Sequence, residues 1–220
     1  MADISSNDKR EYALIIFNVL IVIFVAIGTI VMLNNLDSAT GLTSEGIENF
    51  KYFTVLSNIF CGIVALLYLI FKIKDKKIHI LLKLMAASAT GLTFLIIAAF
   101  LQPMYPELNL YKGGNLFFHL IVPLLAMCEF VLIKTEKIPF KYTFISAILA
   151  LIYGTGYCVN ILINGKGVWP NTNDWYGFLN WGWPVGLVIF AFIVIMDWMM
   201  ACLLRFLNKI LNRVKTEEKG

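Results

Sequence analysis

Long apolar runs alternate with short polar connections along the whole chain. A helix needs about 20 consecutive apolar residues to cross the hydrocarbon core of a bilayer. Six runs reach this length, and no stretch between them is long enough to form a separate domain. The pattern predicts an all-α integral membrane protein, a single six-helix bundle over residues 1–220, with approximate helices at 12–33, 50–71, 80–102, 115–133, 142–163 and 183–207.

The composition excludes an ordinary soluble domain. Hydrophobic residues make up 60% of the chain and charged residues 15%, and the mean hydropathy is +0.79. A soluble domain carries about 25% charged residues. The bilayer is therefore the first partner that the sequence predicts.

Basic residues are distributed unevenly between the two sides of the predicted bundle. Fifteen of the eighteen lie before the first helix, near the second and fourth connections or in the C-terminal tail, whereas Lys51, Lys112 and Lys166 lie on the opposite side. The positive-inside rule therefore predicts a cell-membrane protein with both termini in the cytoplasm. This asymmetry accounts for the net charge of +4 and gives no reason to expect a nucleic-acid partner.

Polar residues inside membrane spans are rare and costly, so those present are the first functional candidates. Thr54 and Asn58 lie in the outer half of the second predicted helix, and Asn115 and His119 in the outer half of the fourth. Each pair has the i, i+4 spacing that puts two side chains on one helix face. Counting residues at 1.5 Å each puts Thr54 and His119 both about 6 Å below the outer boundary. We therefore expect a shared polar pocket that opens outward.

Other polar residues near this depth are candidates for the edge of the pocket. Ser57 lies close to the helix face that carries the threonine, and Gln102 ends the third helix. Tyr157 and Asn160 lie near the outer end of the fifth helix. The last outer loop, residues 165–184, is rich in Trp, Gly and Asn, and its length and turn-forming residues suit a lid.

A second polar group, Asn18, Glu129 and Asp197, lies in the cytoplasmic half of the predicted bundle. Intramembrane carboxylates usually pair with other groups or face a cavity. The first interpretation is a hydrogen-bonded structural cluster to which Arg205 or Lys134 contributes a positive charge. The alternative is a proton or ion path.

The outer pair has the chemistry of a nucleophile and its base. A threonine hydroxyl attacks efficiently only when a neighbouring base takes its proton, and histidine is the usual base near neutral pH. Asn58 or Asn115 would orient the imidazole or donate to an oxyanion, and Pro123 would kink the fourth helix and open space there. One histidine without carboxylates or thiolates cannot complete a zinc site, and no phosphate-binding loop occurs, so we expect no metal and no cofactor.

Two stretches carry a resemblance to a known family. "YFTVLSN" at 52–58 and "FFHLIVP" at 117–123 resemble the androgen-induced gene 1 / androgen-dependent TFPI-regulating protein family, most closely its smaller bacterial members with six helices. Members with known activity are multi-pass threonine hydrolases that cleave fatty-acid esters of hydroxy fatty acids. The resemblance implies that Thr54 is the nucleophile and His119 the base. The bacterial Tyr-Pro-Phe-Leu-Asp pattern of the last outer loop is not kept, because Gly177 and Asn180 replace the proline and the acid.

The function predicted from these observations is hydrolysis of a membrane lipid or fatty-acid ester, or transfer of its acyl group, through an acyl-threonine intermediate. The alternative is a non-catalytic transporter or lipid-binding protein. In that case the outer pocket and the Glu129–Asp197 group would line a path through the bundle.

Overall fold

The computed structural model describes residues 6–34, 46–107, 109–135, 137–168 and 171–217. Helices make up most of these ranges, and no strand occurs in them. In these ranges six helices are long and apolar enough to cross a membrane, which confirms the all-α prediction and supports a multi-pass membrane protein. They run over Asp8–Leu33, Phe53–Ile73, Ile80–Met104, Gly114–Leu132, Lys141–Asn164 and Trp183–Asn212.

Three of the spans are single helices and three are built from shorter pieces. The single helices are α1 (Ser6–Leu33), α2 (Phe53–Ile73) and α9 (Trp183–Glu217). The third span joins α3 (Ile80–Ile96), the π-helical turn η2 (Ile97–Leu101) and α4 (Gln102–Met104), and the fourth joins α5 (Gly114–Leu116), the π-helical turn η3 (Phe117–Ile121) and α6 (Val122–Leu132). The fifth joins α7 (Lys141–Ser146) and α8 (Ile148–Asn164). Two short 3-10 turns also occur: η1 (Gly46–Lys51) precedes α2, and η4 (Phe178–Trp181) precedes α9.

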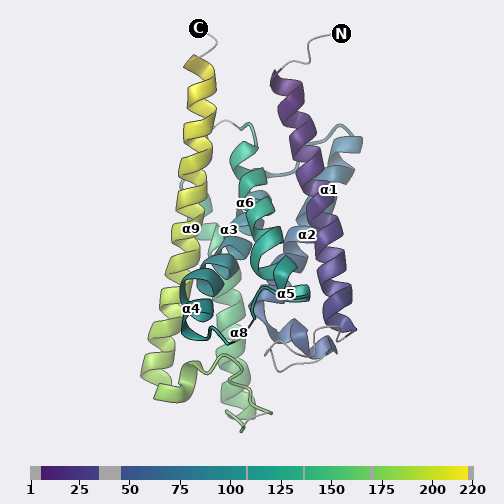
Figure 1. Ribbon diagram of the computed structural model, residues 1–220. Coiled ribbons are helices and arrows are strands. Elements are labelled where there is room, and N and C mark those ends of the chain that lie inside the picture. Colours follow the sequence, from purple (N-terminus) through teal and green to yellow (C-terminus); the bar gives the residue numbers. More distant parts are fainter. Residues whose placement is uncertain (1–5, 35–45, 108, 136, 169–170, 218–220) are drawn as a thin grey trace.

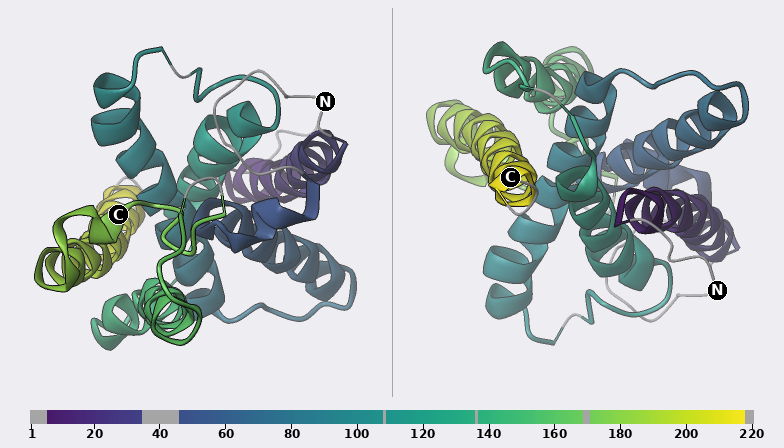
Figure 2. Two further views of the ribbon diagram at one scale, coloured as in Figure 1. Left: turned by 90° about the horizontal axis from the view of Figure 1, so that it is seen from below. Right: turned by 90° about the horizontal axis from the view of Figure 1, so that it is seen from above.

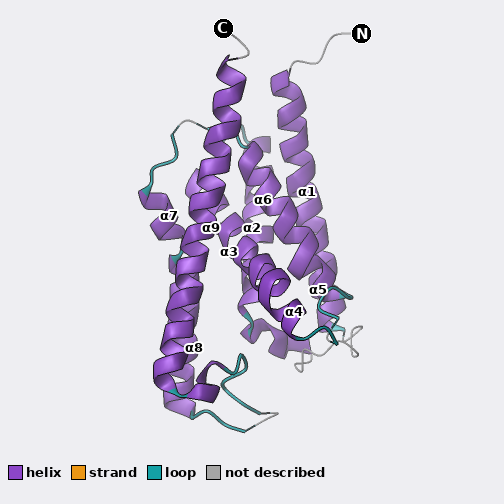
Figure 3. Ribbon diagram, turned by 60° about the vertical axis from the view of Figure 1, so that its left-hand side comes forward, coloured by secondary structure: helices purple, strands orange, loops and turns teal. Residues whose placement is uncertain are grey.

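The bundle has two distinct ends. α1 begins and α9 ends at the same end (Figure 1), which we call the terminal end. The opposite end, called the loop end, carries η1, α5 and the connection between α8 and α9. α2 and the α5–η3–α6 span both run from the loop end to the terminal end, and α7 and α8 lie beside α9 (Figure 3).

α3 is the central helix of the bundle. It packs against α2, α6 and α9, and the views along the bundle show it between them (Figure 2). Its span is 56% buried, whereas no other span exceeds 39%. The buried run from Ala86 to Thr93 consists almost wholly of alanine, serine, threonine and glycine. Small residues let helix backbones approach closely in a membrane, which explains why this sequence occupies the centre.

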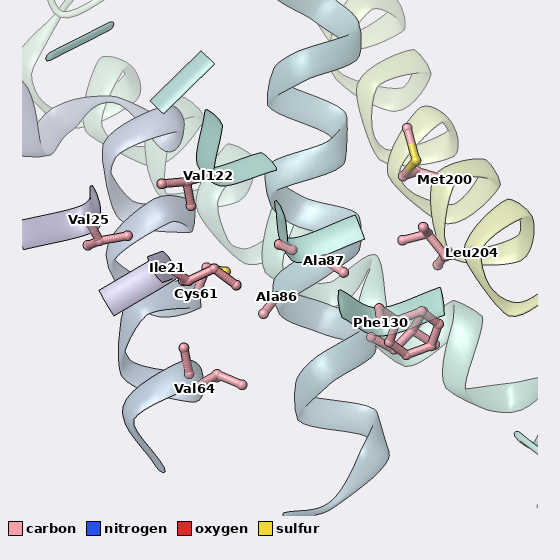
Figure 4. Packing of buried hydrophobic residues seen from close by; sticks show 14 of the residues in the cluster. Ile21, Val25, Cys61, Val64, Ala86, Ala87, Val122, Phe130, Met200 and Leu204 are labelled. Carbon is pink, nitrogen blue, oxygen red and sulfur yellow. The ribbon is translucent and has the colours of Figure 1, made fainter. Parts of the chain in front are cut away.

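The apolar core lies toward the middle and the terminal end of the bundle. It combines side chains from α1, α2, α3, α6 and α9 (Figure 4), among them Ile21, Cys61, Ala87, Phe130 and Met200. The outer surface of the bundle exposes large apolar side chains such as Ile16, Leu162 and Val188. An apolar exterior of this extent is typical of a lipid-facing surface.

Both π turns occur at the same distance from a proline. In η2 the N–H of Gln102 bonds to the carbonyl of Ile97, and in η3 the N–H of Val122 bonds to the carbonyl of Phe117, five residues back in each case. The next residue is Pro103 or Pro123, which has no N–H and cannot continue the helical hydrogen-bond pattern. The carbonyl of the second residue in each turn, Ala98 in η2 and Phe118 in η3, therefore has no backbone donor. Pro123 thus widens a helical turn, where the sequence predicted a kink.

Candidate functional site

His119 lies in η3 with only 2% of its surface exposed. Its Nδ1 is 2.6 Å from the carbonyl oxygen of Leu110, which lies just before α5. A carbonyl oxygen only accepts hydrogen bonds, so Nδ1 carries the proton and the lone pair of the neutral ring lies on Nε2. The geometry therefore presents Nε2 as a proton acceptor. The expected orienting amides, Asn58 and Asn115, do not contact the imidazole in any hydrogen bond of the described residues.

Gln102 holds the backbone that orients this histidine. Its Oε1 accepts a hydrogen bond from the N–H of Leu110 at 3.3 Å, and Leu110 is buried. Gln102 was expected at the edge of the pocket because it ends the third span. The structure links it to His119 through Leu110, whose N–H bonds to Gln102 and whose carbonyl bonds to the imidazole.

Asn58 connects α2 to η3. Its side chain is completely buried, and its Nδ2 donates to the Thr54 carbonyl at 2.7 Å and to the Phe118 carbonyl at 3.0 Å. Phe118 is the residue whose carbonyl loses its backbone donor because of η3 and Pro123. Asn58 therefore satisfies a hydrogen-bond acceptor that lipid would leave unpaired. Its own Oδ1 is buried and has no partner among the described residues.

Thr54 is the second residue of α2 and is half-buried. A helical threonine usually bonds back to the carbonyl four residues earlier, but this hydroxyl makes no hydrogen bond to any residue that the structure describes. The Asn58 side chain donates to both the Thr54 and the Phe118 carbonyl, so Thr54 and His119 lie at a similar level along the bundle axis. Helical side chains lean toward the N-terminus, so both side chains lean toward the loop end.

Ser57 and Asn115 lie beside this arrangement. Ser57 is buried, and its hydroxyl lies 3.1 Å from the Thr54 carbonyl and 3.4 Å from the hydroxyl of Thr93 on α3. Asn115 is half-buried in α5. The sequence predicted that Asn115 would share a face with His119, but η3 begins between them and its wider turn interrupts the four-residue repeat.

The connection between α8 and α9 covers the start of α2. The hydroxyl of Tyr176 accepts a hydrogen bond from the Phe53 N–H at 2.8 Å, which is one of the donors that a helix N-terminus leaves unpaired. Tyr153 donates to the Lys51 carbonyl at 2.5 Å and lies 3.2 Å from the Tyr176 hydroxyl. Burial raises the pKa of the Tyr176 phenol well above its ordinary value. The expected lid thus contacts the residue next to Thr54; its Trp169 and Pro170 lie outside the described residues.

Tyr157 and Asn160 hold the lid and do not reach His119. Tyr157 donates to Asp174 Oδ1, and Asp174 Oδ2 accepts from the Leu179 N–H at 3.0 Å. Asn160 Nδ2 lies 3.4 Å from the side-chain oxygen of Asn173. Their expected role as pocket edges is therefore replaced by contacts with the loop, because they lie on α8, which packs on α3, α7 and α9.

The deep polar cluster differs from its prediction. Asn18 donates to Glu129 at 2.9 Å, and Lys83 forms an ion pair with Glu129 at 3.0 Å and donates to Asn18. The positive charge thus comes from Lys83. This residue is the fourth of α3, and its side chain is already 97% enclosed by neighbouring helices. Neither expected cation takes part: Arg205 donates to the Ile138 carbonyl, and Lys134 is exposed.

Asp197 lies apart from that cluster on α9. It is fully buried beside Ser88 of α3, and neither carboxylate oxygen has a hydrogen-bond partner among the described residues. The prediction that Asp197 joins Asn18 and Glu129 in one hydrogen-bonded group is therefore wrong. The two acids lie on different helices, α6 and α9, and within the described ranges only Glu129 pairs with a cation.

Comparisons with protein-family models, curated proteins and solved structures find no match to this chain. Function must therefore be argued from the site itself. Among the described residues, no three His, Cys, Asp or Glu side chains are grouped as metal ligands. The Asn58 amide, bound to the Thr54 and Phe118 carbonyls, brings the threonine and the His119 imidazole into the same region of the loop end.

Proposed function

We propose that the protein is a membrane-embedded lipid-ester hydrolase in which Thr54 is the nucleophile and His119 the base. One observation carries the proposal: the Asn58 side chain joins Thr54 to Phe118, the residue before His119. The Nε2 atom of His119 is left as a proton acceptor, because its Nδ1 bonds to the Leu110 carbonyl. The resemblance of both stretches to a threonine hydrolase family agrees with this assignment. The substrate class is a membrane lipid or fatty-acid ester.

The proposed reaction uses these groups in two steps. His119 Nε2 takes the proton of the Thr54 hydroxyl while Oγ1 attacks the ester carbonyl carbon. The bond to the alcohol then breaks, the alcohol leaves with the proton from Nε2, and an acyl-threonine remains. A water molecule, or an alcohol in the transfer reaction, attacks the acyl group with His119 again as base. The Leu110 carbonyl keeps Nδ1 protonated in both steps.

The Asn58 side chain has a second role in this mechanism. Its Oδ1 is a buried acceptor without a partner in the described residues, and such groups are rare in folded proteins. A water molecule or a substrate hydroxyl that donates to Oδ1 would satisfy it beside Thr54. Because His119, Asn58 and Ser57 are buried, substrate entry requires movement of the lid that Tyr176 fixes to α2.

Labelling with a fluorophosphonate, followed by mapping of the modified residue, tests the proposal. The hydroxyl of Thr54 should displace fluoride and form a bond to phosphorus, and Thr54→Ala should remove the label. Thr29→Ala is a matched control, because its hydroxyl bonds to the Val25 carbonyl and takes no part in the site. A label on another residue, or a folded Thr54→Ala protein with wild-type turnover, would refute the assignment.

The orientation in the cell membrane is part of the same proposal. The basic residues gather at the terminal end, which we assign to the cytoplasm, so the Thr54 site faces the outer leaflet. In a background without native cysteines, a cysteine at Asn171 should react with an impermeant thiol reagent in intact cells, and one at Asp75 should not. The reverse pattern would move the site to the cytoplasmic leaflet.

Transport is the second candidate, and the unpartnered carboxylate of Asp197 favours it. An ionised carboxylate inside the bilayer is costly, so Asp197 holds a proton or a cation. In this case Asp197→Asn should abolish ion-dependent uptake by proteoliposomes while Thr54→Ala leaves it unchanged. The hydrolase proposal predicts instead that Thr54→Ala abolishes ester turnover and that Asp197→Asn leaves it unchanged.

A further inference from the structure

A cavity of about 460 Å³ opens at the terminal end of the bundle, away from the loop end that holds Thr54. It is formed by the start of α1, the end of α2, the connection to α3, the start of α3 and the segment after α6. Six basic residues line it: Arg10, Lys72, Lys76, Lys77, Lys83 and Lys134. The acidic residues in the lining are Glu11 and Asp75.

Two of the basic side chains are already neutralised. Lys72 pairs with Glu11, and Lys83 pairs with Glu129. The remaining lining carries four basic side chains, Arg10, Lys76, Lys77 and Lys134, against the single carboxylate of Asp75. The cavity therefore has an excess of positive charge that no described side chain balances.

Arg10 is the buried member of this set. Only 9% of its surface is exposed, and its guanidinium donates to the Leu132 carbonyl and to Asn212 Oδ1, the latter at 2.8 Å. Both acceptors are neutral, and Arg10 forms no ion pair within the described part of the chain. A buried charge without a counter-charge is costly. Because a guanidinium has five N–H donors in a planar fork, Arg10 keeps donors for an anion in the cavity.

We propose that this cavity binds a phosphate-bearing anion, with the buried Arg10 guanidinium as its main contact and Lys76, Lys77 and Lys134 at its rim. A planar guanidinium is the side chain best suited to a phosphate group. Part of the wall is apolar and includes Leu14, Tyr68 and Ile133. Such a wall accommodates the glycerol and first acyl carbons of a phospholipid. The phosphate belongs either to a headgroup of the adjacent leaflet or to a soluble phosphate compound.

The positive-inside distribution alone does not account for this arrangement. Lysines that only satisfy that rule extend into water at the membrane surface, as Lys137 and Lys141 do. Arg10 is instead enclosed and held in place at the wall of a cavity. The proposal is independent of the Thr54–His119 chemistry, because the two sites lie at opposite ends of the bundle.

The experiment measures the thermal unfolding midpoint of the purified full chain in neutral detergent. Phosphatidylglycerol, phosphatidylcholine or sodium pyrophosphate is titrated at constant ionic strength. Phosphatidylglycerol should raise the midpoint and phosphatidylcholine should not. A Lys76→Gln/Lys77→Gln variant should weaken the apparent affinity about tenfold or more, since each basic residue near an anionic surface adds to the attraction. Arg10→Gln should remove binding; the double lysine variant keeps the test valid if Arg10→Gln does not fold.

The matched control is Lys137→Gln/Lys141→Gln, which removes two exposed charges outside the cavity lining. It should bind phosphatidylglycerol as the wild type does. Stabilisation by phosphatidylglycerol alone assigns the cavity to a leaflet headgroup, and stabilisation by pyrophosphate as well assigns it to soluble phosphate compounds. The proposal is overturned if neither anion raises the midpoint, or if the control loses as much affinity as the cavity variant.

Discussion

The two polar sites inside the bundle are built in opposite ways. In the deep cluster, the side chains of Asn18, Lys83 and Glu129 bond to one another, and the two charges cancel. At the loop end, by contrast, His119 and Asn58 are held by backbone carbonyls. A cluster whose members satisfy each other has no group left for a substrate. A site positioned by the backbone keeps its reactive atoms available, which is the condition for chemistry.

The two π turns show the same contrast on a smaller scale. η2 and η3 have the same spacing to their prolines, so each frees one carbonyl, of Ala98 and of Phe118. The freed carbonyl in η3 meets Asn58, whereas no side chain among the described residues donates to the one in η2. η2 lies at a partly exposed position near the loop end. η3 therefore differs from η2 in the neighbouring helix that satisfies its freed carbonyl, and not in its spacing to the proline.

The largest expected effect is the loss of turnover at the loop-end site. Thr54→Ala should abolish ester hydrolysis, and His119→Ala should lower kcat by about 10²–10⁴-fold, the usual contribution of a general base. The double variant should be no slower than Thr54→Ala, because residues that act as one unit are not additive. Steady-state kinetics with a lipid ester checks this. Additive losses in the double variant would show that the two residues act separately.

The deep cluster should respond in stability and not in chemistry. Lys83→Met leaves the Glu129 carboxylate buried without a counter-charge, which should cost about 3–5 kcal/mol of unfolding free energy. Lys83→Met with Glu129→Leu removes both charges and should recover most of that loss. Unfolding in detergent measures the effect, and fluorophosphonate labelling of the folded fraction should stay at the wild-type level. Loss of labelling in the folded double variant would contradict the separation of the two sites.

The difference between the sites also explains what the sequence could predict. Each span follows from a run of about 20 apolar residues, and Asn58 and His119 were identifiable because polar residues are conspicuous in such runs. The Leu110 carbonyl that orients His119 has no sequence signal, since every residue has a carbonyl. Lys83 is one of the fifteen basic residues that the sequence places on the side of the termini, and only packing shows that it is buried.

Asn58 should have an intermediate effect, because it joins the loop-end site to the helix packing. Asn58→Leu leaves the Phe118 carbonyl without a donor in a buried position, which should cost about 1–3 kcal/mol. Ester turnover should also fall, since α2 and η3 lose their common contact. Asn34→Leu is the control, because Asn34 is exposed and bonds only to its own helix. Unchanged stability and turnover in Asn58→Leu would mean that the bridge does not position the site.

The smallest effect is expected at the lid. Tyr176→Phe removes the acceptor of the Phe53 N–H and should lower the unfolding free energy by about 1 kcal/mol. Burial raises the pKa of Tyr176, so the folded protein keeps this proton at a pH where the unfolded chain has lost it. Wild-type stability should therefore fall as the pH rises above about 10, the ordinary pKa of tyrosine. Part of this alkaline fall should be absent in Tyr176→Phe but kept in Tyr105→Phe, which changes an exposed phenol. If the Tyr176→Phe protein lost stability with pH as steeply as the wild type, the Tyr176 phenol would not be the group that closes the lid on α2.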